Sequence, residues 1–282
     1  TPCLYQYESD NLVDWSYSGI FAKAKEGQGS MWECPSLFQT EEKTVLLTSP
    51  EHIDGMRQKS LYFLGREIAG NFYQEVKEEV DYGCDYYAAQ FFSSQNGPMM
   101  VNAWMNKWDN EHKTKTEGWI GTMTTPRTFF LGQDGKVKGE FINSLKKLRK
   151  NEIHLSNISM ESDRGFSFAG GKTSFWMKAD LVWETMQGTY FEMRFLTGKA
   201  GSGGLTIRFE KNKNCITVEN HTVNHEESRR CIPVQFDFWS QNLKMDILVD
   251  VSCVEILIAN EIFITNCVYE YVECFVSDYC KT

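Results

Sequence analysis

The first 140 residues consist of short apolar or aromatic runs separated by polar turn clusters. Runs of this length between Gly, Asn, Asp and Ser clusters predict short β-strands and an all-β fold. On this pattern alone a sandwich, a barrel and a propeller stay open. A polar turn followed by an aromatic residue occurs twice, at 9–15 and 65–72, and such repetition favours a propeller. The strands are predicted at 44–48, 60–64, 86–92 and 98–104, the last two joined as a hairpin.

The segment 141–150 has a different pattern, with Ile142, Leu145 and Leu148 spaced three apart and four cations near its end. This spacing places the three apolar residues on one side of a helical turn, and the cations suit the C-terminal end of a helix dipole. We predict a short helical connector here, at residues 141–151, between the two halves of the chain.

After the connector the strands lengthen and alternate regularly between apolar and polar residues. Such alternation means that one face of each strand is buried and the other is wet, as in a β-sandwich. Ala259 and Asn260 are predicted to form a tight hairpin between the last two of these strands. The strands are predicted at 189–195, 205–209, 245–250, 254–258 and 261–265, within a sandwich at 152–282.

The composition of the chain argues against several classes of binding partner. The formal net charge of −9 and the pI near 5.2 give an acidic surface that repels phosphate backbones, so we expect no nucleic-acid partner. No apolar run approaches the roughly 18 residues that a membrane span requires, and we expect no membrane insertion. The five His residues are scattered without ligand spacing, so no metal site and no cofactor are predicted.

Cysteines and glycosylation motifs bear on the compartment. Six of the nine Cys residues fall between 215 and 280, where they could form three bridges in an oxidising compartment. Two three-residue sequons, at Asn157 and Asn220, fit a secretory route, although such motifs also arise by chance. The expectation from these features is an extracellular or vacuolar/lysosomal location.

The stretch that carries candidate chemistry is Ser30 to Phe38, in which Glu33 stands between Trp32 and Cys34 and shortly before Pro35. Apolar neighbours disfavour the charged form of a carboxyl group, and a carboxyl that keeps its proton can act as a general acid. The alternative is a Glu at a strand end that points into solvent, as most Glu side chains do.

Five blocks follow one another along nearly the whole chain: Trp32-Glu33-Cys34-Pro35, Asp81 to Gln90, Trp104 to Trp108, Gly118 to Arg127, and Leu248 to Ile256. In this order they resemble the β-fructosidases of glycoside hydrolase family 32, which include invertases and fructan hydrolases. Val251 stands where the last block usually has Arg, and Ser36 stands where many relatives have Asp.

The resemblance implies a five-bladed β-propeller followed by a β-sandwich, with residues 1–140 supplying about the last three blades. It implies a retaining hydrolase that releases fructose from sucrose or a fructan, with Glu33 as acid/base. The substrate-binding residues that it suggests are Trp32, Cys34, Asp85 and Trp104. A homodimer through the sandwich is one possible assembly.

The nucleophile of this family lies in an Asn-Asp-Pro-Asn-Gly motif, and a further carboxylate lies in Arg-Asp-Pro; neither motif occurs in this sequence. We therefore expect both upstream of Thr1, and expect this chain alone to be inactive and not to be a complete folding unit. Asp81 and Asp85 are the available substitutes for the nucleophile, but Asp81 is better explained as the cap of a backbone bend. A non-catalytic carbohydrate-binding protein on the same scaffold is the alternative.

Overall fold

The computed structural model describes residues 1–93, 97–108, 113–159, 165–167, 172–183, 188–198, 203–223, 228–240, 242–269 and 273–279. Within these residues the fold is all-β, and the only helical segments are short 3-10 turns. None of the helices found there is long and apolar enough to cross a membrane. The 3-10 turns are η1 (Lys113–Glu117), η2 (Asn143–Leu148), η5 (Lys211–Lys213) and η7 (Phe236–Ser240).

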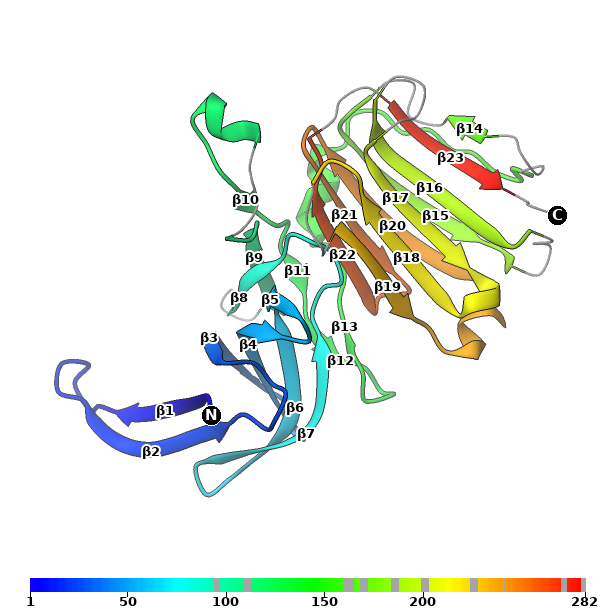
Figure 1. The fold of residues 1–282 in the computed structure, drawn as a ribbon. Coiled ribbons are helices and arrows are strands. Elements are labelled where there is room, and N and C mark those ends of the chain that lie inside the picture. The colour runs from blue at the N-terminus through cyan, green and yellow to red at the C-terminus, as the bar shows by residue number, and fades with distance from the viewer. Residues whose placement is uncertain are drawn as a thin grey trace.

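In the described part of the N-terminal half, four small antiparallel sheets follow one another like the blades of a propeller (Figure 1). The first is a hairpin of β1 (Cys3–Glu8) and β2 (Ser16–Lys23), which projects from one end of the molecule. The second contains β3 (Met31–Gln39), β4 (Thr44–Ile53), β5 (Met56–Gln58), β6 (Leu61–Ile68) and β7 (Asn71–Glu79). The third contains β8 (Tyr87–Ser93), β9 (Met99–Met105), β10 (Thr122–Met123) and β11 (Arg127–Thr128), and the fourth β12 (Phe130–Leu131) and β13 (Val137–Lys138).

Two apolar clusters hold these sheets together, one on each face of the second sheet. Phe21 of β2 packs with Trp32, Leu46 and Phe63 on the face toward the hairpin. On the opposite face, side chains of β4 and β6 pack with side chains of β8 and β9, including Ala89. Each sheet therefore buries its apolar positions against the next sheet along the chain.

The described residues of the C-terminal half form two antiparallel sheets that face each other (Figure 1). One has six strands in the order β14 (Gly165–Ser167), β23 (Glu273–Tyr279), β16 (Tyr190–Thr197), β17 (Leu205–Glu210), β18 (Cys215–Asn220) and β19 (Arg229–Pro233). The other has four in the order β15 (Phe175–Leu181), β20 (Leu243–Asp250), β21 (Cys253–Ile258) and β22 (Ile262–Cys267).

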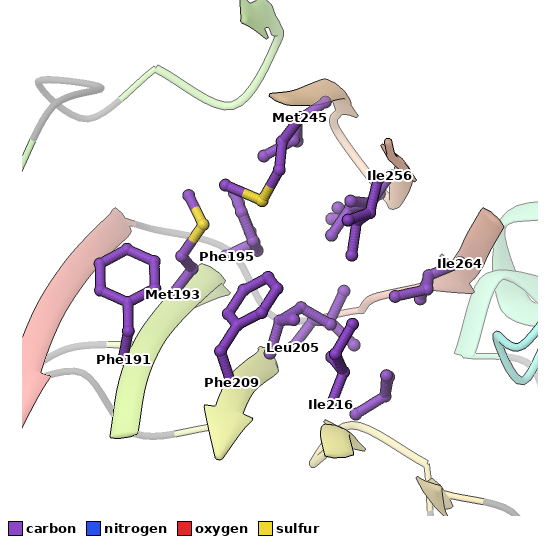
Figure 2. Close-up of a cluster of buried hydrophobic side chains, with 14 of the residues drawn as sticks. Phe191, Met193, Phe195, Leu205, Phe209, Ile216, Met245, Ile256 and Ile264 are labelled. Atoms are coloured by element: carbon purple, nitrogen blue, oxygen red, sulfur yellow. The ribbon is translucent and has the colours of Figure 1, made fainter. Parts of the chain in front are cut away.

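The core of this half lies between its two sheets. Figure 2 shows Phe195, Leu205 and Phe209 of the six-stranded sheet pointing toward Met245 and Ile256 of the four-stranded one. The regular burial alternation of β20 fits the periodicity of its sequence. The predicted tight turn is present: Ala259 and Asn260 both have positive φ, and Glu261 N donates to Ile258 O at 3.0 Å.

A buried ionic cluster joins the two halves, and we call it the Arg127 cluster. It consists of Arg127 and Asp81 from the N-terminal half and Glu255 and Thr265 from the C-terminal half. Arg127 donates to Asp81 Oδ2 at 2.7 Å, to Glu255 Oε2 at 2.9 Å and to Thr265 Oγ1. Burial disfavours the charged guanidinium, but the two facing carboxylates outweigh that effect and raise the pKa of Arg127 above its usual value.

Asp81 has two roles at this junction. Its Oδ1 accepts hydrogen bonds from Gly83 N and Thr265 N, both at 2.8 Å, while its Oδ2 faces Arg127. The first bond closes the backbone bend predicted from the Asp-Tyr-Gly sequence, so the interpretation of Asp81 as a cap is confirmed. Because its oxygens are engaged within the fold, Asp81 is a structural residue rather than a substitute nucleophile.

Candidate active site

Glu33 lies on β3 at a β-bulge, where the strand carries one extra residue relative to β4. Glu33 pairs with Ser49, whereas Ser36 pairs with Leu47, so three steps along β3 match two steps along β4. Cys34, inside the bulge, has a φ of 49°, a left-handed conformation that is uncommon for residues other than glycine. Bulges of this kind redirect side chains and occur often beside active sites.

The bulge reverses the alternation of side chains along β3. Trp32 packs on the hairpin side of the sheet, where it stacks on Phe63 with ring centroids 4.9 Å apart. Phe38, six residues further, packs on the opposite side against β8. A regular strand would place both on one face because the period of side chains is two. Glu33 consequently lies on the same side as Ser36 and Phe38, toward β8.

Tyr87 of β8 is the direct partner of Glu33. Its hydroxyl donates to Glu33 Oε2 at 2.5 Å and also lies 3.2 Å from the carbonyl oxygen of Ser49. Burial, followed by the hydrogen bond to Glu33, raises the pKa of Tyr87 far above its usual value. The phenol therefore keeps its proton across the physiological range and remains a donor to the half-buried carboxyl group.

A second bulge positions Tyr87. Tyr87 pairs with Trp104 of β9, but Gln90 pairs with Asn102, and Ala88 between them has a φ of 54°. The same backbone device thus occurs in two consecutive sheets, one residue after Glu33 and one residue after Tyr87. Each bulge turns a polar side chain toward the space between β3 and β8.

The two bulges are also bonded to each other. Gln90 Nε2 donates to the carbonyl oxygen of Cys34 at 2.7 Å, and Phe91 N donates to Ser36 Oγ at 3.1 Å. These contacts connect β3 to β8 just C-terminal to Glu33 on one strand and to Tyr87 on the other. Ser36, which stands where the resemblance leads us to expect an Asp, therefore bonds the backbone of the neighbouring sheet.

The predicted substrate-binding residues lie in different environments. Trp104 is half-buried beside Tyr87, and its ring meets Trp108 edge-on at 5.2 Å. Gly121 fits against this ring because any Cβ there would lie 2.4 Å from Trp104 Nε1. Cys34 is exposed next to Glu33; partial burial and the Glu33 charge raise the pKa of its thiol.

The side chains of Trp32 and Asp85 do not lie beside Glu33 and Tyr87 at the candidate site. The Trp32 ring is 8% exposed in the core, and its Nε1 donates to Gln28 O at 2.8 Å. Asp85 is fully buried at the junction of the two halves, where Cys267 N donates to its Oδ2 at 2.8 Å. Through these contacts both side chains have structural roles. The contacts do not support the prediction that Trp32 and Asp85 bind substrate.

Sequence reasoning did not single out Tyr87 as a functional residue. Its only signal was its position in the Tyr86-Tyr87 doublet of the block that begins at Asp81. Together, Glu33, Tyr87 and Trp104 provide a carboxyl group with a fixed neutral donor and an adjacent aromatic surface. This arrangement can deliver and recover a proton at a bound hydroxylated molecule.

Comparison with known proteins gives the family. The model for the glycosyl hydrolases family 32 N-terminal domain matches residues 1–140, and the model for the family 32 C terminal matches residues 144–278. A sucrose-6-phosphate hydrolase from Zymomonas mobilis is 28% identical over 273 residues, which are 90% of this chain and 51% of the relative. The chain thus spans about half the length of the curated relatives it matches.

Solved structures show the same fold. A family 32 β-fructofuranosidase from Bombyx mori aligns with a TM-score of 0.78 at 22% identity, over 97% of this chain and 57% of that one. A mutant of the Bombyx mori enzyme in complex with sucrose aligns equally widely, with a TM-score of 0.77 at 22% identity. An exo-inulinase from Aspergillus awamori aligns with a TM-score of 0.81 at 20% identity, over 98% and 59%. With both family models matched in order along nearly its whole length, this chain belongs to glycosyl hydrolase family 32.

Proposed function

We propose that this chain is the C-terminal portion of a β-fructofuranosidase-type hydrolase that releases fructose from sucrose or a β-fructan. The single observation that carries the proposal is the hydrogen bond from Tyr87 to Glu33 at 2.5 Å, between two bulged strands. It supports a carboxyl group that is held in one orientation and therefore prepared for proton transfer. The relatives named above act on sucrose, its phosphate or inulin by their names, which agrees with a fructosyl substrate.

In the proposed mechanism Glu33 is the acid/base. Tyr87 donates to Oε2, so the acidic proton is carried on Oε1 and passes from there to the glycosidic oxygen of the leaving sugar. The resulting carboxylate then removes a proton from the water that releases fructose, as in retaining hydrolysis. Retention requires a second carboxyl group on the opposite face of the sugar, about 5–5.5 Å away. We place that nucleophile outside these 282 residues because the family motif does not occur among them.

The proposed architecture of the whole protein is a five-bladed propeller followed by a β-sandwich. The sheets from β1 to β13 would then be about the last three blades, with the β1–β2 hairpin as the incomplete one. The two facing sheets of the C-terminal half would be the sandwich. In that arrangement β3 and β8 lie in neighbouring blades and carry Glu33 and Tyr87 toward the shared centre.

A secretory or vacuolar location is part of the proposal, and the two glycosylation sequons bear on it differently. Asn157 is exposed and accessible for glycosylation. Asn220 is 2% exposed, and its Nδ2 donates to Cys267 O at 2.7 Å, so the folded chain cannot carry a glycan there. Seven cysteines are free thiols in the structure: Cys3, Cys34, Cys84, Cys215, Cys231, Cys253 and Cys267.

The test is Glu33→Gln in the longer protein that contains this chain. We expect the rate of fructose release from sucrose to fall by about 10²–10⁴-fold, the usual contribution of a general acid. An aryl fructoside whose leaving group needs no proton should be cleaved with a much smaller loss in its first step. Glu42→Gln, an identical change in the exposed β3–β4 turn, is the matched control and should retain activity. Unchanged turnover of sucrose by Glu33→Gln would refute the proposal.

A non-catalytic carbohydrate-binding protein is the second candidate, and the exposed aromatic ring of Trp108 beside Trp104 favours it. The sugar-binding surface of such a protein would be formed by Trp104 and Trp108, and Trp108 is 63% exposed. Measurement of free fructose after incubation of sucrose with the longer protein separates the two candidates. Binding of sucrose without any release of fructose would support the second.

A further inference from the structure

Cys253 and Cys267 lie directly opposite each other on β21 and β22. The register pairs their Cα atoms, and Val268 N donates to Ser252 O at 2.8 Å on one side of the pair. Ser252 and Val268 are therefore a hydrogen-bonded pair, and because such pairs alternate along antiparallel strands, Cys253 and Cys267 form a non-hydrogen-bonded pair. In that position the Cα atoms are about 4.5 Å apart and the side chains leave the sheet on the same face.

This geometry meets the requirement for a covalent bridge. Disulfides join Cα atoms about 4.4–6.8 Å apart, so a non-hydrogen-bonded pair lies at the short end of the accepted range. We propose that Cys253 and Cys267 are a modification site, at which an intramolecular disulfide forms across β21 and β22. Bridges at the limit of the geometric range are more easily reduced, which makes this bond a reversible modification.

Formation of the disulfide would change a contact between the two halves of the chain. Cys267 Sγ donates to the carbonyl oxygen of Met105 at 3.5 Å, across the junction of the two halves. Met105 adjoins Trp104 in β9, and both cysteines belong to the apolar cluster around Met105 and Tyr269. A disulfide has no thiol hydrogen, so its formation removes this bond between the halves.

The reaction requires an oxidant, and a small-molecule disulfide such as oxidised glutathione supplies it. The thiolate of Cys253, the more exposed of the two, attacks one sulfur of oxidised glutathione and releases one glutathione thiolate. The Cys267 thiolate then attacks the mixed disulfide at the Cys253 sulfur and releases the second glutathione. Two protein thiols lose two protons and two electrons, and one glutathione disulfide becomes two thiols. Burial, followed by the charges of Glu255 and Asp250, raises the pKa of Cys253 to about 12, so the exchange is slow and needs long incubation.

The experiment is peptide mapping of the folded protein after incubation with oxidised glutathione and alkylation of the remaining thiols. Trypsin leaves both cysteines on one peptide because no Lys or Arg lies between them, and a second digestion with a protease that cuts after glutamate then separates 245–255 from 262–270. We expect these two peptides to be joined and to separate after reduction. Cys253→Ser and Cys267→Ser should each abolish the link, and Cys231→Ser, on β19 of the other sheet, should preserve it.

Recovery of both cysteines as alkylated thiols after prolonged oxidation would overturn the inference. So would a stable glutathione adduct on Cys253 in the unsubstituted protein, or a bridge from either residue to a different cysteine. The readout is the mass of the linked peptides, so it is independent of whether the protein hydrolyses fructosides.

Discussion

Removal of the cation from the Arg127 cluster is expected to destabilise the junction of the two halves. Arg127→Met keeps most of the apolar stem but removes the guanidinium, whose Cζ lies 4.7 Å from the centre of the Phe263 ring and 5.1 Å from that of Tyr86. It removes the cation from between Asp81 and Glu255 and leaves two buried carboxylates without it. Breaking a buried ion pair by removing one partner typically costs about 3–5 kcal/mol.

The remaining contacts place the expected loss near the lower end of that range. Asp81 retains its bonds from Gly83 N and from Thr265, and Glu255 Oε1 retains Thr125 N at 2.9 Å. We therefore expect the free energy of unfolding to fall by about 3 kcal/mol. With a urea m-value of about 3 kcal/mol/M, this loss lowers the unfolding midpoint by roughly 1 M.

The assay is urea unfolding followed by tryptophan fluorescence, with Arg66→Met as the matched control. Arg66 is 61% exposed in its side chain and pairs with Glu75 at 3.0 Å, so its loss should cost about 0.5 kcal/mol or less. Arg127→Lys keeps the charge without the forked donors and should fall between the two. Equal midpoints for Arg127→Met and Arg66→Met would refute the view that the cluster holds the two halves together.

Three further changes test the site and the junction. Tyr87→Phe in the longer protein should lower kcat/KM for sucrose about 10–100-fold, because it removes a hydrogen bond to the Glu33 carboxyl worth about 1.5–3 kcal/mol. Burial, and then nearby carboxylates, raise the pKa of Tyr82 to about 12. Between pH 10 and 12 the unfolded state loses this proton while the folded state keeps it, so stability should fall with rising pH, by about 1.4 kcal/mol per unit for this group. Gly83→Ala should destabilise the fold by several kcal/mol in urea unfolding, because its Cβ would lie 1.9 Å from Thr265 O.

Each of these changes has a control in the chain. Tyr73→Phe, at an exposed tyrosine of β7, should leave kcat/KM unchanged. Tyr82→Phe should flatten the decline in the urea midpoint between pH 10 and 12, and an identical slope would contradict the assignment. Gly55 has a φ of 75° with no heavy atom within 4 Å of an added Cβ, so Gly55→Ala should cost only about 1–2 kcal/mol of backbone strain. If Gly83→Ala costs no more than that, the close packing against Thr265 is not rigid.

The sequence predicted the strands well where one face is buried and the chain is regular, as at 205–209 and 245–250. It was less informative where backbone geometry departs from regularity. The connector forms a 3-10 turn at Asn143–Leu148, in which Leu145 packs on Phe141 and Leu257 while Leu148 is 74% exposed. Three-residue spacing does not distinguish a 3-10 turn from an α-helix, since apolar residues three apart share a face in both.

The candidate site was accessible to sequence reasoning only in part. Glu33 was identified from its neighbours and from the resemblance, but Tyr87 lies 54 positions away and no local pattern links the two. The burial of Asp85 depends on Cys267, 182 positions away, so periodicity could not separate a sugar-facing side chain from one at the junction. Pairings between distant strands are set by the tertiary fold, which single-sequence patterns do not encode.

Because of the bulge at Cys34, the side of the sheet on which Glu33 lies depends on whether the number of residues between Glu33 and Phe38 is odd or even. The Glu33 carboxyl and the Phe38 ring share a side of the sheet only because the number of residues between them is one greater than a regular strand would allow. Deletion of either Cys34 or Pro35 would restore a regular count and turn the carboxyl toward Phe63, away from Tyr87. In this short stretch the length of the chain constrains the site more than the identity of its side chains, so substitutions there should be tolerated better than single-residue deletions.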